Sequence, residues 1–143
     1  MKFITRTSGE TKKIAARLAR RLRGGEVIAL LGPLGSGKTV FAKGLARALG
    51  IPEREVRSPT FVIVMEHRQG RLPFFHFDCY RFSRPGELET TPFEDYRRAG
   101  GVIVLEWAGR VSGLLPPETL RVRLRVLDAL RREITLSGIE PPL

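Results

Sequence analysis

The sequence predicts an α/β fold with a largely parallel central sheet, helices on its faces and an antiparallel hairpin at the end. Apolar runs of strand length alternate with segments of helical periodicity, which is the pattern of an α/β domain. A glycine-rich loop joins the first of these runs directly to a helical segment. The chain has 143 residues, so we expect a single domain over 1–143.

Two helices surround one strand in the first third of the chain. Residues 8–23 carry an apolar stripe at helical spacing among lysines and arginines, and Ser8 is suited to cap this helix. Val27–Leu31 is continuously apolar, which is typical of a strand buried on both faces. Residues 41–49 return to helical spacing, and Gly50 ends this second helix.

The middle of the chain contains three more apolar runs of strand length. They lie at 61–64, 72–77 and 102–105, and each predicts a strand. Residues 85–99 do not form a clean helical pattern because Pro92 interrupts it. We therefore expect an irregular helical excursion between two strands there.

The last segment alternates strictly between apolar and charged residues. Residues 120–126 place Arg121, Arg123 and Arg125 on one face of a strand, and 133–136 repeat the alternation more briefly. Together these two segments predict a terminal antiparallel hairpin. The arginine row is either a stripe that docks a partner or a charged face that protects an edge strand from aggregation.

Residues 32–39 read Gly-Pro-Leu-Gly-Ser-Gly-Lys-Thr, a complete phosphate-binding loop. Its glycines let backbone N–H groups turn onto phosphate oxygens, Lys38 supplies charge for the β- and γ-phosphates, and the Thr39 hydroxyl is suited to ligate Mg²⁺. The following helix adds the positive end of its dipole. The loop predicts binding of a nucleoside triphosphate, and the alternative is a glycine-rich turn without a ligand.

Two acidic residues directly follow apolar runs. Asp78 follows 74–77, and Glu106 follows 102–105. An acid at the carboxyl end of a strand beside such a loop holds Mg²⁺ or orients the attacking water. Glu106 is the better metal candidate because its run is wholly apolar and therefore central. For each acid, the alternative is a carboxylate that caps backbone amides where a loop begins.

Two other polar features lie between the loop and these acids. In Ser58-Pro59-Thr60, the proline pushes its neighbour out of helical geometry and leaves Thr60 at the start of a strand, where its hydroxyl is placed to sense a γ-phosphate. An ordinary turn fits the same residues equally well. We interpret His76, in an apolar strand, as a core histidine rather than a general base.

Composition limits the classes of protein to which the chain can belong. The formal charge is +10, but the basic residues are scattered and not interleaved with aromatics, which favours a solvated surface over direct RNA binding. No apolar run has the length of a membrane span, and the first residues lack the apolar core of a secretory signal. Cys79 is the only cysteine. We therefore expect a cytoplasmic protein without disulfides.

Four motifs, in this order, resemble the bacterial TsaE family of small ATPases in the tRNA threonylcarbamoyladenosine pathway. They are the loop at 34–39, Ser58–Phe61, His76–Arg81 and Glu106-Trp107. The resemblance implies a single P-loop ATPase domain that binds and hydrolyses ATP with Mg²⁺ in support of TsaB and TsaD. Those proteins install threonylcarbamoyl on adenosine 37 of tRNA, so this chain contacts tRNA only indirectly.

The resemblance also implies roles for individual residues. The phosphates are cradled by Gly35, Ser36, Gly37, Lys38, Thr39 and Val40. Thr39 and Glu106 hold Mg²⁺, and Lys38 neutralises charge. Thr60 acts as a switch near the γ-phosphate, and Asp78 orients water or the metal shell.

The resemblance further places the segment from Thr7 to Thr11 beside the adenine. The chain departs from the family at two loop positions, since Pro33 stands where the family usually has aspartate and Ser36 where it usually has alanine. Neither change removes a phosphate-contacting group, although Pro33 withdraws one N–H and stiffens the entry to the loop.

The expected reaction is in-line attack of water on the γ-phosphoryl group, with charge neutralised by Lys38, the loop amides and Mg²⁺. No arginine finger is identifiable, so we expect slow hydrolysis by the chain alone and faster hydrolysis with a partner. Two other classes remain open. One is a small-molecule or nucleoside kinase with 84–98 as its lid, and the other is an ATP-dependent module that binds tRNA directly.

Overall fold

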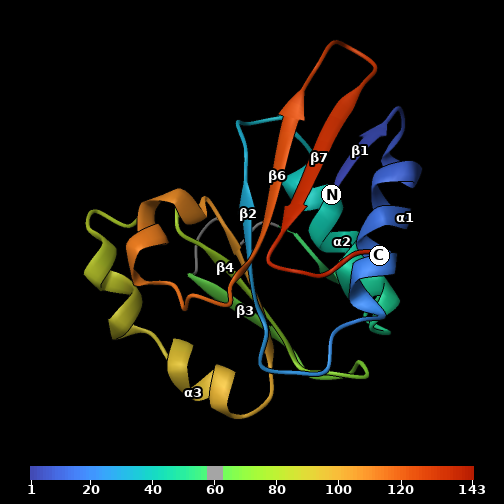
Figure 1. The fold of residues 1–143 in the computed structure, drawn as a ribbon. Helices are drawn as coiled ribbons and strands as arrows, with labels where there is room; N and C mark the ends of the chain where they lie inside the picture. Colours follow the sequence, from blue (N-terminus) through green and yellow to red (C-terminus); the bar gives the residue numbers. More distant parts are fainter. Residues whose placement is uncertain (58–62) are drawn as a thin grey trace.

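The computed structural model describes residues 1–57 and 63–143, and within these residues the chain forms a seven-stranded mixed sheet with helices on both faces (Figure 1). The strand order is β1-β7-β6-β2-β5-β4-β3. The strands are β1 (Lys2–Thr5), β2 (Val27–Leu31), β3 (Val64–His67), β4 (Phe74–Asp78), β5 (Val102–Glu106), β6 (Leu120–Val126) and β7 (Arg132–Ser137). The α-helices are α1 (Ser8–Ala19), α2 (Lys38–Ala48) and α3 (Phe93–Arg98), and the 3₁₀ helices are η1 (Glu53–Glu55), η2 (Pro85–Thr90) and η3 (Ala108–Leu114).

The centre of the sheet is parallel and its flanks are antiparallel. Strands β6, β2, β5 and β4 run parallel to one another. The pairs β3–β4, β6–β7 and β1–β7 are antiparallel. The predicted α/β class and the terminal hairpin are confirmed, while the antiparallel outer strands make the sheet mixed.

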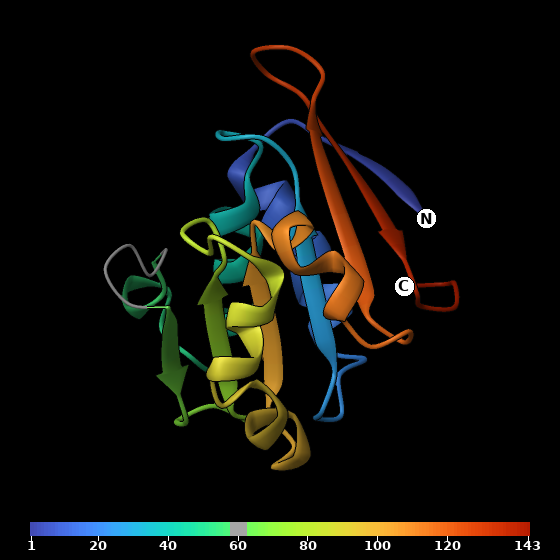
Figure 2. The same cartoon turned by 90° about the vertical axis from the view of Figure 1, so that its left-hand side faces the viewer.

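The helices lie on both faces of the sheet, and each face has its own hydrophobic core (Figure 2). Helices α1 and α2 cover one face, where alternate strand residues such as Ile28, Leu30 and Val104 point toward them. The other core contains Phe93 and Tyr96 of α3 and lies under η2 and η3. No helix among the described residues is long and apolar enough to span a membrane.

Helix α1 is capped and ends at residues other than those predicted from the sequence. Thr7, rather than Ser8, caps α1, because its side chain accepts a hydrogen bond from the backbone N–H of Glu10 (3.0 Å). The helix ends at Ala19, four residues before the predicted end. The irregular excursion is confirmed, and Pro92 marks the start of α3.

Further differences concern the strands and two short helices. Strand β1 and helices η1 and η3 were not predicted. The strand expected at 61–64 begins in residues 61 and 62, which lie outside the described residues, and β3 occupies Val64–His67. The neighbouring strands β4 and β5 lie close to their predicted ranges.

The arginine row of β6 does not protect a sheet edge. Strand β6 lies inside the sheet between β2 and β7, so its backbone is paired on both sides. Arg125 lies 3.2 Å from the carboxylate of Glu133 on β7, and Arg121 is half-buried. The edge interpretation is therefore wrong, since β1 forms the outer strand on this side.

Candidate functional site

The strand register brings both candidate acids to the edge of the sheet where the glycine-rich loop begins. Asp78 and Glu106 end the parallel strands β4 and β5 and lie opposite each other. Glu106 also lies opposite Leu30, near the end of β2, from which the loop departs. Because Val102 and Val104 face the core under α2, the alternation of β5 directs Glu106 to that same face.

The Glu106 carboxylate is held at both oxygens. Its Oε1 accepts a hydrogen bond from the Thr39 hydroxyl (3.1 Å), and its Oε2 lies 2.5 Å from Nε2 of His76. Glu106 is 3% exposed and His76 is fully buried. Thr39 is the second residue of α2, so this contact joins the helix that follows the loop to the end of β5.

The Lys38 side chain lies folded against its own loop. Its ammonium donates to the carbonyls of Gly32 (2.7 Å) and Pro33 (3.0 Å) and lies 4.2 Å from the centre of the Trp107 ring. Burial lowers the pKa of Lys38, and the charges of Glu106 and Asp78 oppose that shift. The ammonium thus contacts two loop carbonyls and an aromatic ring, and the Lys38 side chain is buried from bulk water.

Glycine is required at two points of this loop. Gly37 immediately precedes α2 with a φ of 104°, a left-handed conformation that suits glycine. A Cβ on Gly32 would lie 2.4 Å from the carbonyl oxygen of Leu124 on β6 and 2.7 Å from the Ser36 hydroxyl. The loop therefore packs tightly on β6.

Ser36 is fully buried, and its hydroxyl has no hydrogen-bond partner among the described residues. A buried hydroxyl without a partner destabilises a fold, because it gives up its bonds to water. We expect Ser36→Ala to raise the free energy of unfolding by about 1 kcal/mol, as measured by urea denaturation. Ser112→Ala, at an exposed serine, is the control and should change little. A loss of stability in Ser36→Ala would contradict this interpretation.

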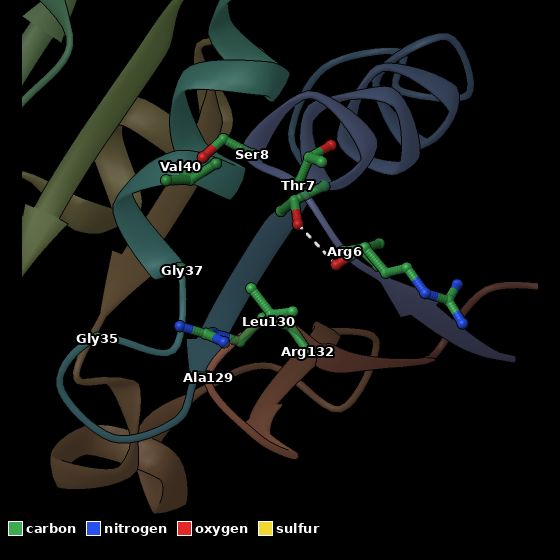
Figure 3. A pocket seen from close by; sticks show the side chains of 11 residues that line it. Arg6, Thr7, Ser8, Gly35, Gly37, Val40, Ala129, Leu130 and Arg132 are labelled. Atoms are coloured by element: carbon green, nitrogen blue, oxygen red, sulfur yellow. Dashed lines mark hydrogen bonds between the residues drawn. The ribbon is translucent and has the colours of Figure 1, made fainter.

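A pocket of about 220 Å³ opens on one side of the loop (Figure 3). Three segments meet there, namely the β1–α1 connection, the loop and the β6–β7 connection. The lining residues are Thr5, Arg6, Thr7, Ser8, Thr11, Gly35, Gly37, Val40, Ala129, Leu130 and Arg132. The structure thus brings Thr7 and Thr11 beside the loop residues that were predicted to cradle phosphates. The sequence analysis did not predict Arg6, which directly precedes the predicted segment 7–11, as part of this pocket. It also did not predict the hairpin residues, because only the fold brings the hairpin to the loop.

A second hollow, of about 270 Å³, lies on the other side of the loop. Its lining residues are Leu34, Gly35, Gly37, Lys38, Thr39, Val40, Glu106 and Trp107. Gly35, Gly37 and Val40 line both hollows, so the loop lies between them. Trp107, which was singled out in the sequence only as part of the Glu106-Trp107 motif, adopts a left-handed backbone conformation with a φ of 57° directly after Glu106.

The structure does not place Asp78 among the residues that line the two hollows, and it does not describe Thr60. The Asp78 carboxylate accepts a hydrogen bond from the backbone N–H of Tyr80 (2.9 Å), and Asp78 does not line the second hollow. Its Oδ1 therefore caps a backbone amide where a loop begins, as the alternative for this position expects, and Oδ2 takes no part in that bond. Thr60 and the rest of its motif lie outside the described residues.

The donors around the second hollow fit Mg²⁺ bound together with a phosphate. Thr39 Oγ1 and Glu106 Oε1 are 3.1 Å apart, close to the separation of about 3 Å between adjacent ligands of an octahedral ion with bonds of about 2.1 Å. No cluster of three or more His, Cys, Asp or Glu ligands exists among the described residues. Mg²⁺ typically uses one or two protein oxygens, water and substrate phosphates, so the small donor set suits it.

Comparison with known proteins gives consistent matches over nearly the whole chain. A profile of the family described as "Threonylcarbamoyl adenosine biosynthesis protein TsaE" matches residues 5–134. The tRNA threonylcarbamoyladenosine biosynthesis protein TsaE of Bacillus subtilis is 40% identical over 139 residues, which cover 97% of this chain and 86% of that protein. The protein of the same name from Treponema pallidum is 38% identical over 137 residues, which cover 96% and 100%. The crystal structure of Bacillus subtilis YdiB matches with a TM-score of 0.79 at 35% identity and covers 95% of this chain and 83% of that one.

Proposed function

Because this chain belongs to the TsaE family of tRNA threonylcarbamoyladenosine biosynthesis, we propose that it is a Mg²⁺-dependent ATPase that supports TsaB and TsaD in this modification. One observation carries the proposal. The loop lies between two hollows, and the second hollow gathers the Lys38 ammonium, the Thr39 hydroxyl and the Glu106 carboxylate. An ammonium, a loop at a helix N-terminus and a hydroxyl–carboxylate pair form a site for a polyphosphate with its divalent cation.

The two hollows support one orientation of the nucleotide. The pocket lined by Thr7, Thr11 and Leu130 takes the base and sugar, and the phosphates cross the loop at Gly35 and Gly37. The terminal phosphate then lies in the hollow that contains Lys38 and Glu106. This orientation places the β6–β7 connection against the base.

Each charged group has a separate task in the proposed reaction. Lys38 leaves the carbonyls of Gly32 and Pro33 and turns its ammonium to the β- and γ-phosphates. Thr39 and Glu106 hold Mg²⁺, which when bound neutralises charge on those phosphates. Asp78, opposite Glu106 in register, orients water or the metal shell and adds negative charge near Lys38.

The structure gives the kinase alternative little support. Its proposed lid, residues 84–98, packs on the core of the face opposite α1 and α2, where Phe93 is buried. Tyr96 stacks on Phe75 with ring centres 3.9 Å apart and donates a hydrogen bond to Glu66 (2.6 Å). A segment anchored in this way is poorly suited to close over the loop.

Reconstitution tests the proposed function. Phosphate release from ATP is measured for the purified chain alone, with TsaB and TsaD, and with both proteins and tRNA, and tRNA modification is followed in parallel. We expect slow phosphate release by the chain alone and an increase of about 10-fold or more with the partners. A 10-fold increase corresponds to one additional contact that stabilises the transition state by about 1.4 kcal/mol. A phosphorylated small-molecule acceptor would favour the kinase. Steeply salt-dependent tRNA binding by the chain alone would favour the tRNA-binding module.

A further inference from the structure

His76 forms the closest side-chain contact to Glu106 that the structure describes. Its Nε2 lies 2.5 Å from Glu106 Oε2, and the imidazole is fully buried. His76 lies on β4 opposite Val104 of β5, two residues before Glu106 on the same face of the sheet. The contact therefore joins neighbouring strands beneath the start of α2.

Packing alone does not account for a histidine at this position. The surrounding core is apolar, with Phe74 and Val104 on the same face. His76 Nδ1 is buried and has no hydrogen-bond partner among the described residues. A buried nitrogen without a partner is unfavourable, and a leucine would fill the space without that penalty. The bond from the other nitrogen to Glu106 is what distinguishes histidine from an apolar residue here.

We propose that His76 is a positioning residue, which fixes the Glu106 carboxylate so that Oε1 faces Thr39 and the bound cation. A carboxylate has only acceptors, so the proton in this bond lies on Nε2 of the histidine. With Oε2 tethered to a buried ring, the carboxylate cannot rotate, and Oε1 stays 3.1 Å from the Thr39 hydroxyl. Hydrogen bonds of this kind orient metal-binding carboxylates. The inference rests on the proposed function, in which Glu106 holds Mg²⁺.

The amides of glutamine and asparagine separate positioning from packing. The amide nitrogen of His76→Gln reaches about as far as Nε2 and can still donate to Glu106, whereas that of His76→Asn is too short. Nucleotide affinity is measured by calorimetry with ADP, in EDTA and across a Mg²⁺ titration. In His76→Asn we expect the Mg²⁺ concentration for half-maximal effect to rise about 10-fold or more, with affinity in EDTA unchanged. In His76→Gln we expect it to stay within about threefold of the parent, since the donor is kept.

A second buried histidine provides the packing control. His67 on β3 is 6% exposed and does not contact Glu106 in the structure. We compare His76→Leu with His67→Leu, which make the same chemical change in neighbouring strands. Only His76→Leu should raise the Mg²⁺ concentration needed for the half-maximal effect on nucleotide affinity.

The outcomes distinguish the inference from the function on which it rests. If the parent chain binds no nucleotide, the proposed function fails and the inference fails with it. If the parent binds Mg²⁺–ADP but His76→Asn keeps the parental Mg²⁺ dependence, only the inference is wrong. An equal loss in His76→Gln and His76→Asn, or in the two leucine variants, also overturns it.

Discussion

Replacing Lys38 with methionine is expected to weaken ATP binding by about 100-fold or more and to abolish hydrolysis. Methionine keeps most of the length of the buried side chain but removes its ammonium group, which lies at the second hollow. A hydrogen bond to a charged group contributes roughly 1.5–3 kcal/mol, and about 2.8 kcal/mol corresponds to a factor of 100 in affinity. Calorimetry with ATP and Mg²⁺ measures the binding, and phosphate release measures the reaction.

The effect on stability should be much smaller than the effect on binding. Lys38 donates to two carbonyls of its own loop, at Gly32 and Pro33, six and five residues earlier in the chain. Methionine loses these local bonds in the nucleotide-free protein, whereas in the proposed complex it loses the charged contact to the phosphates. Lys43→Met is the matched control, because Lys43 is also on α2 but lines neither hollow. ATP binding by Lys38→Met at parental affinity would exclude the loop as the phosphate site.

The sequence predicts the parts of the fold whose signal is local. Val27–Leu31 and Leu120–Val126 have the predicted bounds, because a continuous apolar run and a strict alternation each specify one kind of strand. The loop was predicted from its own motif, and the two acids were predicted because each directly follows an apolar run. Their proximity follows from a general property of parallel sheets, in which carboxyl ends share one edge.

Features that depend on strand order could not be predicted. The arginine row of β6 looks the same in sequence whether the strand is at an edge or inside the sheet. Only the pairing with β2 and β7 shows that the strand lies inside. Leu130 lines the pocket beside the loop because the terminal hairpin returns there. His76 was interpreted as a core residue, and it is buried, but its contact with Glu106 depends on the register of two strands 30 residues apart.

Glu106→Gln tests which acid holds the cation, the question that the sequence left open. Glutamine has the size of glutamate but lacks its charge, and its amide nitrogen cannot bind Mg²⁺. We expect nucleotide affinity in EDTA to be retained, the gain in affinity with Mg²⁺ to be lost, and hydrolysis to fall by about 100-fold or more. The same calorimetric and phosphate-release measurements apply.

Asp78→Asn is the matched variant on the neighbouring strand. Its carboxylate already accepts the N–H of Tyr80, which an asparagine oxygen can also accept, and Asp78 does not line the second hollow. We therefore expect the Mg²⁺ dependence of binding to persist in Asp78→Asn, with hydrolysis reduced less than in Glu106→Gln. The opposite ranking would indicate that Asp78, rather than Glu106, holds the cation. It would also remove the reason for His76 to hold Glu106, because an oriented carboxylate matters to the reaction only if the cation binds there.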